Sequence, residues 1–176
     1  MPTNARSTAV LTAILLFTLT LAAHVPCAAS GVGQTISDAT APVLLTGELL
    51  LLTDKNAGKA QAVQGAKALI TNEVLTEGLK YVVREKRPNS DSKTSFPSGH
   101  TSAAFTMATV ITGYHPKYGW LAYGTAAAIG WSRVDVRAHH WWDVVAGAGL
   151  GCVVGSHYTH QHLTAGPGGM KVNWRF

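Results

Sequence analysis

Residues 93–105 read KTSFPSGHTSAAF and mark the point where a polar loop turns into an apolar run. Proline, serine and glycine are loop residues, and the stretch after His100 is typical of a helix that begins there. The first turn of a helix offers unpaired backbone N–H groups and a partial positive charge. An imidazole at this position therefore indicates a site for an anion, above all phosphate, whose other parts must come from elsewhere in the chain.

The rest of the chain is dominated by apolar runs with helical spacing. No segment shows sustained alternation of polar and apolar residues, and the Ala- and Gly-rich runs are typical of closely packed helices. Arg87-Pro88 is expected to stop a helix, because the residue before a proline leaves the helical region. We predict a loop over 30–42 and helices over 43–53, 57–85 (one helix or two), 100–113, 120–133 and from 139 or 141 to 158. The predicted fold class is all-α, a single-domain helical bundle.

These helices are short for a membrane. The uncharged cores 101–113, 119–131 and 144–156 have 13 residues each, whereas a transmembrane helix needs about 20. Their length favours helices buried in a protein core. Because the cores are apolar on nearly every face, a peripheral or edge-on contact with a membrane is the alternative.

The first 29 residues differ from the rest of the chain. Arg6 precedes an uncharged apolar run of 14 residues at 10–23, and small residues follow up to Ala29. This order is typical of a secretory signal peptide, with cleavage expected after Ala29. We predict a signal peptide over 1–29, a domain over 30–176 and export to the periplasm or another extracytoplasmic location. The alternative is an uncleaved anchor and a membrane-associated protein.

Cleavage would also change the charge and the cysteine content. The chain has 14 Lys and Arg against nine Asp and Glu, a net charge of +5, and the loss of Arg6 leaves +4. The loss of Cys27 leaves Cys152 alone, so no intrachain disulfide is expected. This mild basicity suits an anionic substrate or a membrane surface and is too small to indicate nucleic acid. The sequence does not determine an oligomeric state.

A second motif, upstream of His100, supplies cations. The segment KYVVREKRP at 80–88 places Lys80 seven positions before Arg87. If the helix continues, positions 80, 84 and 87 share one face, with Lys80 and Arg87 about 10 Å apart along the axis. Both side chains could then converge on one anion. Taken alone, such a cluster is more often a solvated helix end that complements the dipole.

A third motif, SRVDVRAHHWWD at 132–143, supplies Arg133, His139 and Asp143. Near a helix start, a carboxylate four residues after a histidine can accept the Nδ1 proton. This pairing leaves Nε2 free and makes the ring a better nucleophile. His140 lies three residues before Asp143, a spacing that also permits contact, and is the second candidate.

Together the three motifs resemble the signature of the type 2 phosphatidic acid phosphatase family. They cover residues 80–143 in the family's order and read Lys80-x6-Arg87-Pro88, Pro97-Ser98-Gly99-His100 and Ser132-Arg133-x5-His139-x3-Asp143. This family shares its site with bacterial non-specific acid phosphatases and vanadium haloperoxidases. The resemblance implies a helical bundle, which agrees with the all-α prediction reached from the periodicity.

The resemblance also implies a role for each matching residue. His139 would be the nucleophile, Asp143 would orient it and stabilise its charge, and His100 would act as general acid and then as base. Phosphate binding would fall to the cations and to backbone N–H groups of the second motif, namely Lys80, Arg87, Ser98, Gly99 and Arg133. No metal or other cofactor is implied, and vanadate is expected to bind as a phosphate mimic.

The expected reaction is metal-independent hydrolysis of phosphomonoesters, or of lipid phosphates and pyrophosphates, through a phosphohistidine intermediate. The substrate is therefore a phosphorylated small molecule or a lipid phosphate. Trp141 and Trp142 could line a pocket for an apolar substrate tail, although core packing or anchoring at a membrane interface explains them as well.

Two other functions compete with this one. A vanadate-dependent haloperoxidase would use the same oxyanion ligands. A non-catalytic periplasmic protein would bind phosphate in the cationic pocket or a metal in the tail. The spacing of His157, His160 and His162 suits a divalent metal, although a solvated helix end is the more frequent explanation.

Overall fold

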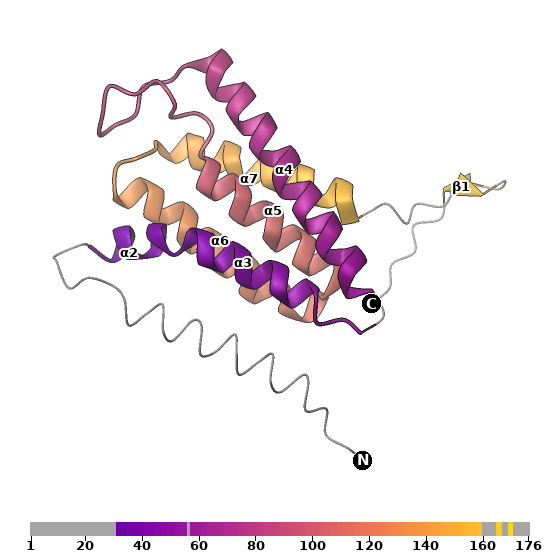
Figure 1. Cartoon of the computed structure of the whole chain (residues 1–176). Coiled ribbons are helices and arrows are strands. Elements are labelled where there is room, and N and C mark those ends of the chain that lie inside the picture. Colours follow the sequence, from indigo (N-terminus) through magenta and orange to yellow (C-terminus); the bar gives the residue numbers. More distant parts are fainter. Residues whose placement is uncertain (1–30, 56, 160–164, 167–168, 171–176) are drawn as a thin grey trace.

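The computed structural model describes residues 31–55, 57–159, 165–166 and 169–170. These residues form a helical bundle followed by one pair of two-residue strands (Figure 1). The elements are α2 (Val32–Asp38), α3 (Thr40–Leu51), α4 (Gly58–Val83), α5 (Gly99–Tyr114), the 3₁₀ helix η1 (Pro116–Tyr118), α6 (Gly119–Asp135), α7 (Trp141–Thr159) and the antiparallel strands β1 (Ala165–Gly166) and β2 (Gly169–Met170). The all-α prediction is confirmed.

Helix α5 is the centre of the bundle. It packs against α3, α4, α6 and α7, and Figure 1 shows it surrounded by these helices. Its buried positions run from Thr101 near its start to Ile111 near its end. A helix without a broad polar face belongs in a protein interior. The segment that begins with PSGH therefore decides both the core of the fold and the position of His100.

Two groups of buried apolar side chains fill the space around α5. The first joins α3, α4, α5 and α7 and consists of Leu51, Ala68, Met107, Val110, Ile111 and Val154. The second joins α5 and α6 and consists of Ala104, Ala108, Ala126 and Ile129. The small alanines of the second group allow α5 and α6 to lie close together.

Helix α7 approaches α5 along a row of glycines. An added Cβ on Gly147 would lie 2.7 Å from the carbonyl oxygen of Ser98, and one on Gly151 would collide with that of Ser102. Gly155 meets α5 one turn further on. These glycines are four residues apart and share one face of α7. Because Ser98 belongs to the PSGH segment, this contact fixes the separation between the second and third sequence motifs.

Replacing Gly151 with alanine is expected to destabilise the fold by about 1–3 kcal/mol, because overpacking forces the two backbones apart. Gly149, on the same helix, has nothing within 4 Å of an added Cβ. The matched control Gly149→Ala should therefore stabilise the protein by about 0.5–1 kcal/mol through helix propensity. Chemical unfolding of the full chain measures both changes. Equal effects of the two substitutions would contradict the tight α5–α7 packing.

The prediction of a loop over 30–42 is wrong. Its described part, from residue 31, forms α2 and the start of α3, where Oγ1 of Thr40 donates to the carbonyl oxygen of Ser37 at 2.7 Å. Helix α2 packs on α6, and Gly33 lies against the side chain of Asp135. The Gly, Thr and Ser residues of α2 have low helix propensity. Contact with α6, rather than local preference, therefore makes this segment helical.

The other predicted helices are present, with ends that differ by a few residues, and 57–85 forms the single helix α4. In the described part of the chain, no helix has both the length and the hydropathy that a bilayer crossing requires. The predicted signal peptide over 1–29 lies outside the described residues, as do His160 and His162. Cys152, on α7, forms no disulfide within the described residues.

Candidate active site

The three sequence motifs meet at one end of the bundle. The loop 84–98, the start of α5 and the connection from α6 to α7 gather there, on the left in Figure 1, with α2 beside them. Contacts between distant segments hold this end together. Nδ2 of Asn89 donates to the carbonyl oxygen of Val136, and Nε1 of Trp142 donates to Oε1 of Glu85.

The prediction that Lys80, Arg84 and Arg87 share one helical face is wrong. Arg84 adopts a left-handed conformation, with φ of 53°, and ends α4. The following loop folds back on itself, since the N–H of Ser95 donates to the carbonyl oxygen of Glu85 at 2.9 Å. Lys80 therefore approaches the site from the last turn of α4, and Arg87 approaches it from the loop.

Two arginines carry buried donors that lack an acceptor. Nε of Arg87 and Nε of Arg133 are buried and have no hydrogen-bond partner among the described residues. Elsewhere on these side chains, Nη1 of Arg133 donates to Oγ of Ser37, and Nη2 of Arg87 donates to the carbonyl oxygen of Thr94 at 3.5 Å. Burial, and then the charge of Arg87, lowers the pKa of Arg133. A bound anion would supply the missing acceptors.

Lys80 brings a third cation to the start of α5. Its Nζ lies over Gly99, where an added Cβ would come within 3.4 Å of it. The side chain is only 13% exposed and pairs with Oε1 of Glu77 at 2.6 Å. Glycine at position 99 therefore lets the ammonium group and the N-terminus of α5 act on the same anion. Lys80, Arg87 and Arg133 are called the three cations below.

His139 is held by a backbone carbonyl. Its Nδ1 lies 2.7 Å from the carbonyl oxygen of Ser95 and 3.6 Å from Oδ2 of Asp143. A carbonyl can only accept, so Nδ1 carries the proton and Nε2 keeps its lone pair. The tautomer is the predicted one, but the prediction that Asp143 accepts this proton is wrong. The reason is that α7 begins at Trp141, so residue 139 precedes the helix and lacks helical i,i+4 geometry.

Asp143 is fully buried in the first turn of α7. Its Oδ2 accepts from Oγ of Ser95 at 2.5 Å and from the backbone N–H of His140 at 2.8 Å. Its Oδ1 has no hydrogen-bond partner in the described part of the chain. The carboxylate lies close enough to His139 to stabilise a positive charge on that ring. Ser95 thus contacts both residues, with its carbonyl on His139 and its hydroxyl on Asp143.

Ser98 does not offer the phosphate-binding groups that the sequence suggested. Its backbone N–H donates to the carbonyl oxygen of Asp143 at 3.1 Å, and its Oγ is hydrogen-bonded to Oγ1 of Thr101 at 2.9 Å. The residue is fully buried. Ser98 therefore joins the start of α5 to α7, and its N–H is already used. Gly99 is half-buried and His100 is exposed, so the second motif faces the site through these two residues.

The surroundings of His100 and His139 favour the uncharged form of both rings. Desolvation, and then the charges of the three cations, lowers the pKa of His100 to about 4. Burial and the charge of Arg87 lower the pKa of His139 to about 4, against the hydrogen bond to Ser95, which raises it. His139 is 2% exposed, whereas His100, although partly desolvated, is an exposed residue. His100 can therefore exchange a proton with a bound molecule.

A pocket of about 320 Å³ opens beside these residues. It is lined by Pro88, Val134, Arg137, His139, His140, Trp141 and Trp142. Trp141 is 64% exposed and Trp142 is 42% exposed, so core packing does not explain them. The two indoles form an apolar rim next to His139.

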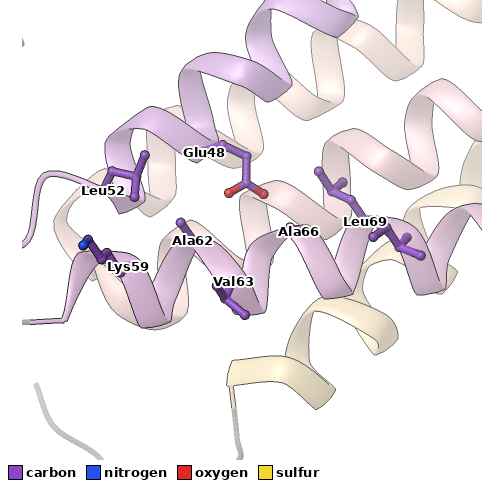
Figure 2. A pocket seen from close by; sticks show the side chains of 8 residues that line it. Glu48, Leu52, Lys59, Ala62, Val63, Ala66 and Leu69 are labelled. Carbon is purple, nitrogen blue, oxygen red and sulfur yellow. The ribbon is translucent and has the colours of Figure 1, made fainter.

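A larger groove lies elsewhere, between α3 and α4 (Figure 2). Its volume is about 640 Å³, and it is lined by Glu48, Leu52, Lys59, Ala62, Val63, Ala66, Leu69 and Ile70. Burial raises the pKa of Glu48. None of the motif residues lines this groove, so its size does not make it the candidate active site.

His140, the second candidate nucleophile, also contacts Asp143. Its Nδ1 lies 3.4 Å from Oδ2 of Asp143 and 3.5 Å from Oε1 of Glu85. Its ring stacks on that of Trp142, with centroids 4.5 Å apart and planes at 6°. The structure therefore brings both histidines to Asp143. Of the two, His139 has the short bond to a backbone carbonyl that fixes its tautomer.

Sequence reasoning missed Ser37, Glu85 and Ser95. Ser95 acts on His139 through its backbone carbonyl, for which no side-chain pattern exists. Ser37 belongs to the segment that was expected to be a loop. A signal for Glu85 was available, since it is the one carboxylate within the basic stretch KYVVREKRP.

Known proteins resemble this chain in sequence and in fold. A family model described as PAP2 superfamily matches residues 62–167. Lipid A 1-phosphatase of Porphyromonas gingivalis is 39% identical over 84 residues, which cover 43% of this chain and 18% of that protein. Probable lipid phosphate phosphatase 4 of Arabidopsis thaliana is 35% identical over 108 residues, which cover 53% of this chain and 33% of that protein.

Among solved structures, Aquifex aeolicus LpxE is similar with a TM-score of 0.63 and 25% sequence identity, over 73% of this chain and 83% of that one. The matches to the lipid A 1-phosphatase and to lipid phosphate phosphatase 4 cover a third or less of the length of those two proteins.

Proposed function

The chain belongs to the PAP2 superfamily, and on this premise we propose that it is a phosphatase that acts on lipid phosphates. It cleaves a phosphomonoester, or the terminal phosphoanhydride of a lipid pyrophosphate, through a phosphohistidine intermediate. The observation that carries the proposal is the 2.7 Å contact between Nδ1 of His139 and the carbonyl oxygen of Ser95. It lies in a site where Arg87 and Arg133 hold buried donors that have no acceptor among the described residues.

In the first step, Nε2 of His139 attacks phosphorus and forms an N–P bond while the P–O bond to the leaving group breaks. His100 donates its proton to the departing oxygen. The carboxylate of Asp143 stabilises the positive charge that develops on the ring of His139. In the second step, His100 takes a proton from water, the water oxygen attacks phosphorus, and inorganic phosphate leaves His139.

The three cations bind the equatorial oxygens of the phosphoryl group, where charge accumulates in the transition state. The N-terminus of α5 at Gly99 adds its partial positive charge. Together these groups provide the charge stabilisation for which other phosphatases use a metal ion, so we propose a metal-independent reaction. Vanadate, which adopts the same geometry as the transferring phosphoryl group, is expected to inhibit.

The proposed substrate class rests on the rim of the site and on the relatives. The indoles of Trp141 and Trp142 border the pocket that contains His139, where an acyl or prenyl chain can lie. The two similar curated proteins are named as phosphatases of lipid A and of lipid phosphate. Both observations favour a lipid phosphate over a small soluble ester.

Phosphate release by the purified chain in EDTA tests the proposal. p-Nitrophenyl phosphate, phosphatidate in mixed micelles and a prenyl pyrophosphate are the three substrates. We expect turnover in EDTA and a higher kcat/KM for the lipids than for p-nitrophenyl phosphate. A loss of activity in EDTA that Mg²⁺ restores would contradict the metal-independent reaction. No release from any substrate, together with halide oxidation by peroxide and vanadate, would replace the phosphatase with a haloperoxidase.

We also propose that residues 1–29 direct export and that the domain over 30–176 acts outside the cytoplasm. The support is the order of Arg6, the apolar run at 10–23 and the small residues up to Ala29. N-terminal sequencing of the protein from fractionated cells checks this. A mature protein that begins at Ser30 is expected, and a full-length protein retained in the membrane would favour the anchor.

The free enzyme should be active over a narrow range of acidic pH. The reaction needs His139 neutral and His100 protonated, and the pKa of each is about 4. Activity is lost below this pH as His139 gains a proton, and above it as His100 loses one. kcat/KM for p-nitrophenyl phosphate should therefore be greatest at acidic pH, near the two pKa values.

The alkaline limb of kcat should lie at higher pH than that of kcat/KM, because a bound phosphate dianion offsets the cations that lower the pKa of His100. The His100→Gln variant should lose the alkaline limb. A kcat/KM that rises steadily to neutral pH in the wild type would contradict the role of His100 as the acid.

A further inference from the structure

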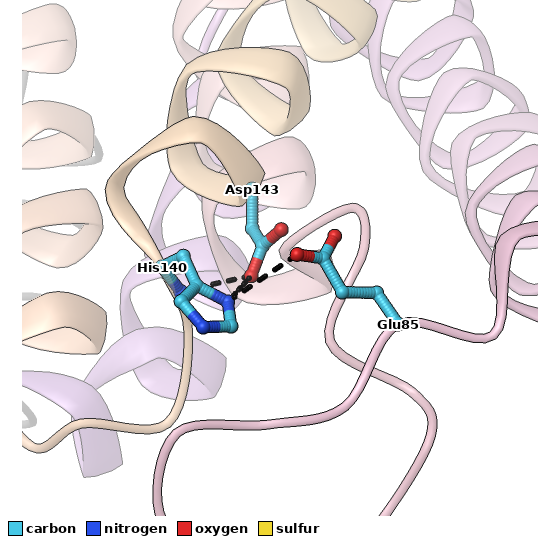
Figure 3. Close-up of side chains that lie close together, drawn as sticks. All are labelled: Glu85, His140 and Asp143. Carbon is cyan, nitrogen blue, oxygen red and sulfur yellow. Dashed lines mark hydrogen bonds and ion pairs between the residues drawn. The ribbon is translucent and has the colours of Figure 1, made fainter.

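We propose that Glu85, His140 and Asp143 form a binding site for a divalent transition-metal ion, best suited to Zn²⁺, and that the bound ion inhibits the enzyme. One ligand atom from each residue lies within 4.8 Å of the others. Figure 3 shows the two carboxylates converging on the ring of His140. These three residues are called the Glu85 cluster below.

The two distances from Nδ1 of His140 to the carboxylates match the ligand separation around a tetrahedral ion. Nδ1 of His140 lies 3.5 Å from Oε1 of Glu85 and 3.4 Å from Oδ2 of Asp143. Two ligands that are each about 2.0–2.1 Å from Zn²⁺ at the tetrahedral angle are separated by about 3.3–3.4 Å. One imidazole nitrogen with two carboxylate oxygens also suits Zn²⁺ better than Ca²⁺, which takes six to eight oxygen ligands.

Trp142 holds two members of the cluster in place. Its Nε1 donates to Oε1 of Glu85 at 2.8 Å, and its ring stacks on His140. Supporting contacts of this kind orient the ligands of metal sites. The side chains of Glu85 and His140 are 26% and 28% exposed, so an ion can reach them from solvent.

Asp143 has unused capacity to bind a cation. Although the residue is fully buried, its Oδ1 has no hydrogen-bond partner among the described residues. Its Oδ2 accepts two hydrogen bonds, from Ser95 and from the backbone of His140. A buried carboxylate that lacks part of its hydrogen bonding gains from a positive ion nearby.

The inhibition follows from the shared carboxylate, and this part of the inference rests on the proposed function. Asp143 lies 3.6 Å from Nδ1 of His139 and stabilises the charge that develops there during phosphoryl transfer. A dication bound to the same carboxylate opposes that positive charge. Occupancy of the Glu85 cluster should therefore lower kcat.

A protonated His140 that shares its Nδ1–H between the two carboxylates would give the same distances without a metal. Metal titration separates the two explanations. Because His157, His160 and His162 could bind zinc independently, the parent protein for the test is the full chain with these three residues changed to asparagine. Zn²⁺ binding is measured by calorimetry on metal-stripped protein, and Co²⁺ binding is followed by its visible absorption.

We expect the parent to bind one ion per chain and to give the intense Co²⁺ bands of a tetrahedral site. Glu85→Gln, which keeps the acceptor for Trp142, and His140→Phe, which keeps the stacking, should each weaken binding at least tenfold. Glu73→Gln, an exposed carboxylate on α4, is the matched control and should bind like the parent. Circular dichroism verifies that each variant folds. If Glu85→Gln does not fold, Trp142→Phe replaces it, because it removes the hydrogen bond that orients Glu85 and should also weaken metal binding.

Absence of binding to the parent, or unchanged binding in both Glu85→Gln and His140→Phe, would overturn the site. In the activity measurement, Zn²⁺ should lower kcat for p-nitrophenyl phosphate about tenfold in the parent. The same Zn²⁺ concentration should leave kcat of Glu85→Gln nearly unchanged. Binding at the cluster without a fall in kcat would overturn the inhibition. A chain without phosphatase activity would refute the proposed function while the titration still decides the metal site.

Discussion

Replacing His139 with alanine is expected to reduce kcat at least about 10⁴-fold, because loss of the nucleophile removes the covalent route altogether. The variant should still bind vanadate, since the three cations remain. The substitution also leaves the hydroxyl of Ser95 on Asp143 intact. Phosphate release at saturating substrate measures the change, and unfolding by denaturant verifies that the variant is folded.

A chemical readout separates His139 from His140 as the nucleophile. Rapid quenching at alkaline pH with labelled substrate should trap one acid-labile phosphoryl group per chain, and tandem mass spectrometry should place it on His139. The control His157→Asn, in the last turn of α7 and outside the site, should keep wild-type turnover. A phosphoryl group on His140, or its retention in His139→Ala, would transfer the role to the second candidate.

Replacing Asp143 with asparagine is expected to lower kcat by about 10²–10³-fold with little change in KM. If Asp143 fixed the tautomer of His139, its neutral replacement would cost about 10⁴-fold through the wrong tautomer. Here the carbonyl of Ser95 accepts the Nδ1 proton at 2.7 Å, and Asp143 is 3.6 Å away. The loss should therefore be limited to the missing electrostatic stabilisation.

The matched comparison for Asp143→Asn is Ser95→Ala. This variant keeps the carbonyl that holds His139 and removes the hydroxyl that donates to Asp143. Because the carboxylate keeps its charge, kcat should fall less than in Asp143→Asn, by about tenfold, the effect of one hydrogen bond to a charged group. Steady-state kinetics of both variants decide whether Ser95 or Asp143 fixes the tautomer of His139. A loss of about 10⁴-fold in Asp143→Asn would show that Asp143, not Ser95, sets the tautomer in solution.

The spacing of the three motifs predicted most of the residues that the structure brings together at the candidate site. Arg133, His139 and Asp143 are close in sequence, so their meeting needs only one turn and the start of α7. His100 follows a Pro-Ser-Gly stretch that allows a helix to begin at Gly99. For Lys80 and Arg87 the sequence indicated cations that the structure brings near the start of α5, but it indicated the wrong geometry. The left-handed conformation of Arg84 that separates them is unfavourable for a non-glycine residue, so local preference does not predict it.

The sequence by itself determined that this protein is a helical bundle, and it predicted an anion site at the start of α5. Helical periodicity and the spacing within each motif depend on residues that are neighbours in the sequence, so they can be recognised without the tertiary structure. Only the tertiary structure decided that Ser95 fixes His139, that Ser37 of α2 reaches Arg133, and that Glu85 lies beside His140. Such contacts join segments distant in sequence through single atoms, often of the backbone, and they form because a polar group that is buried on packing must find a partner.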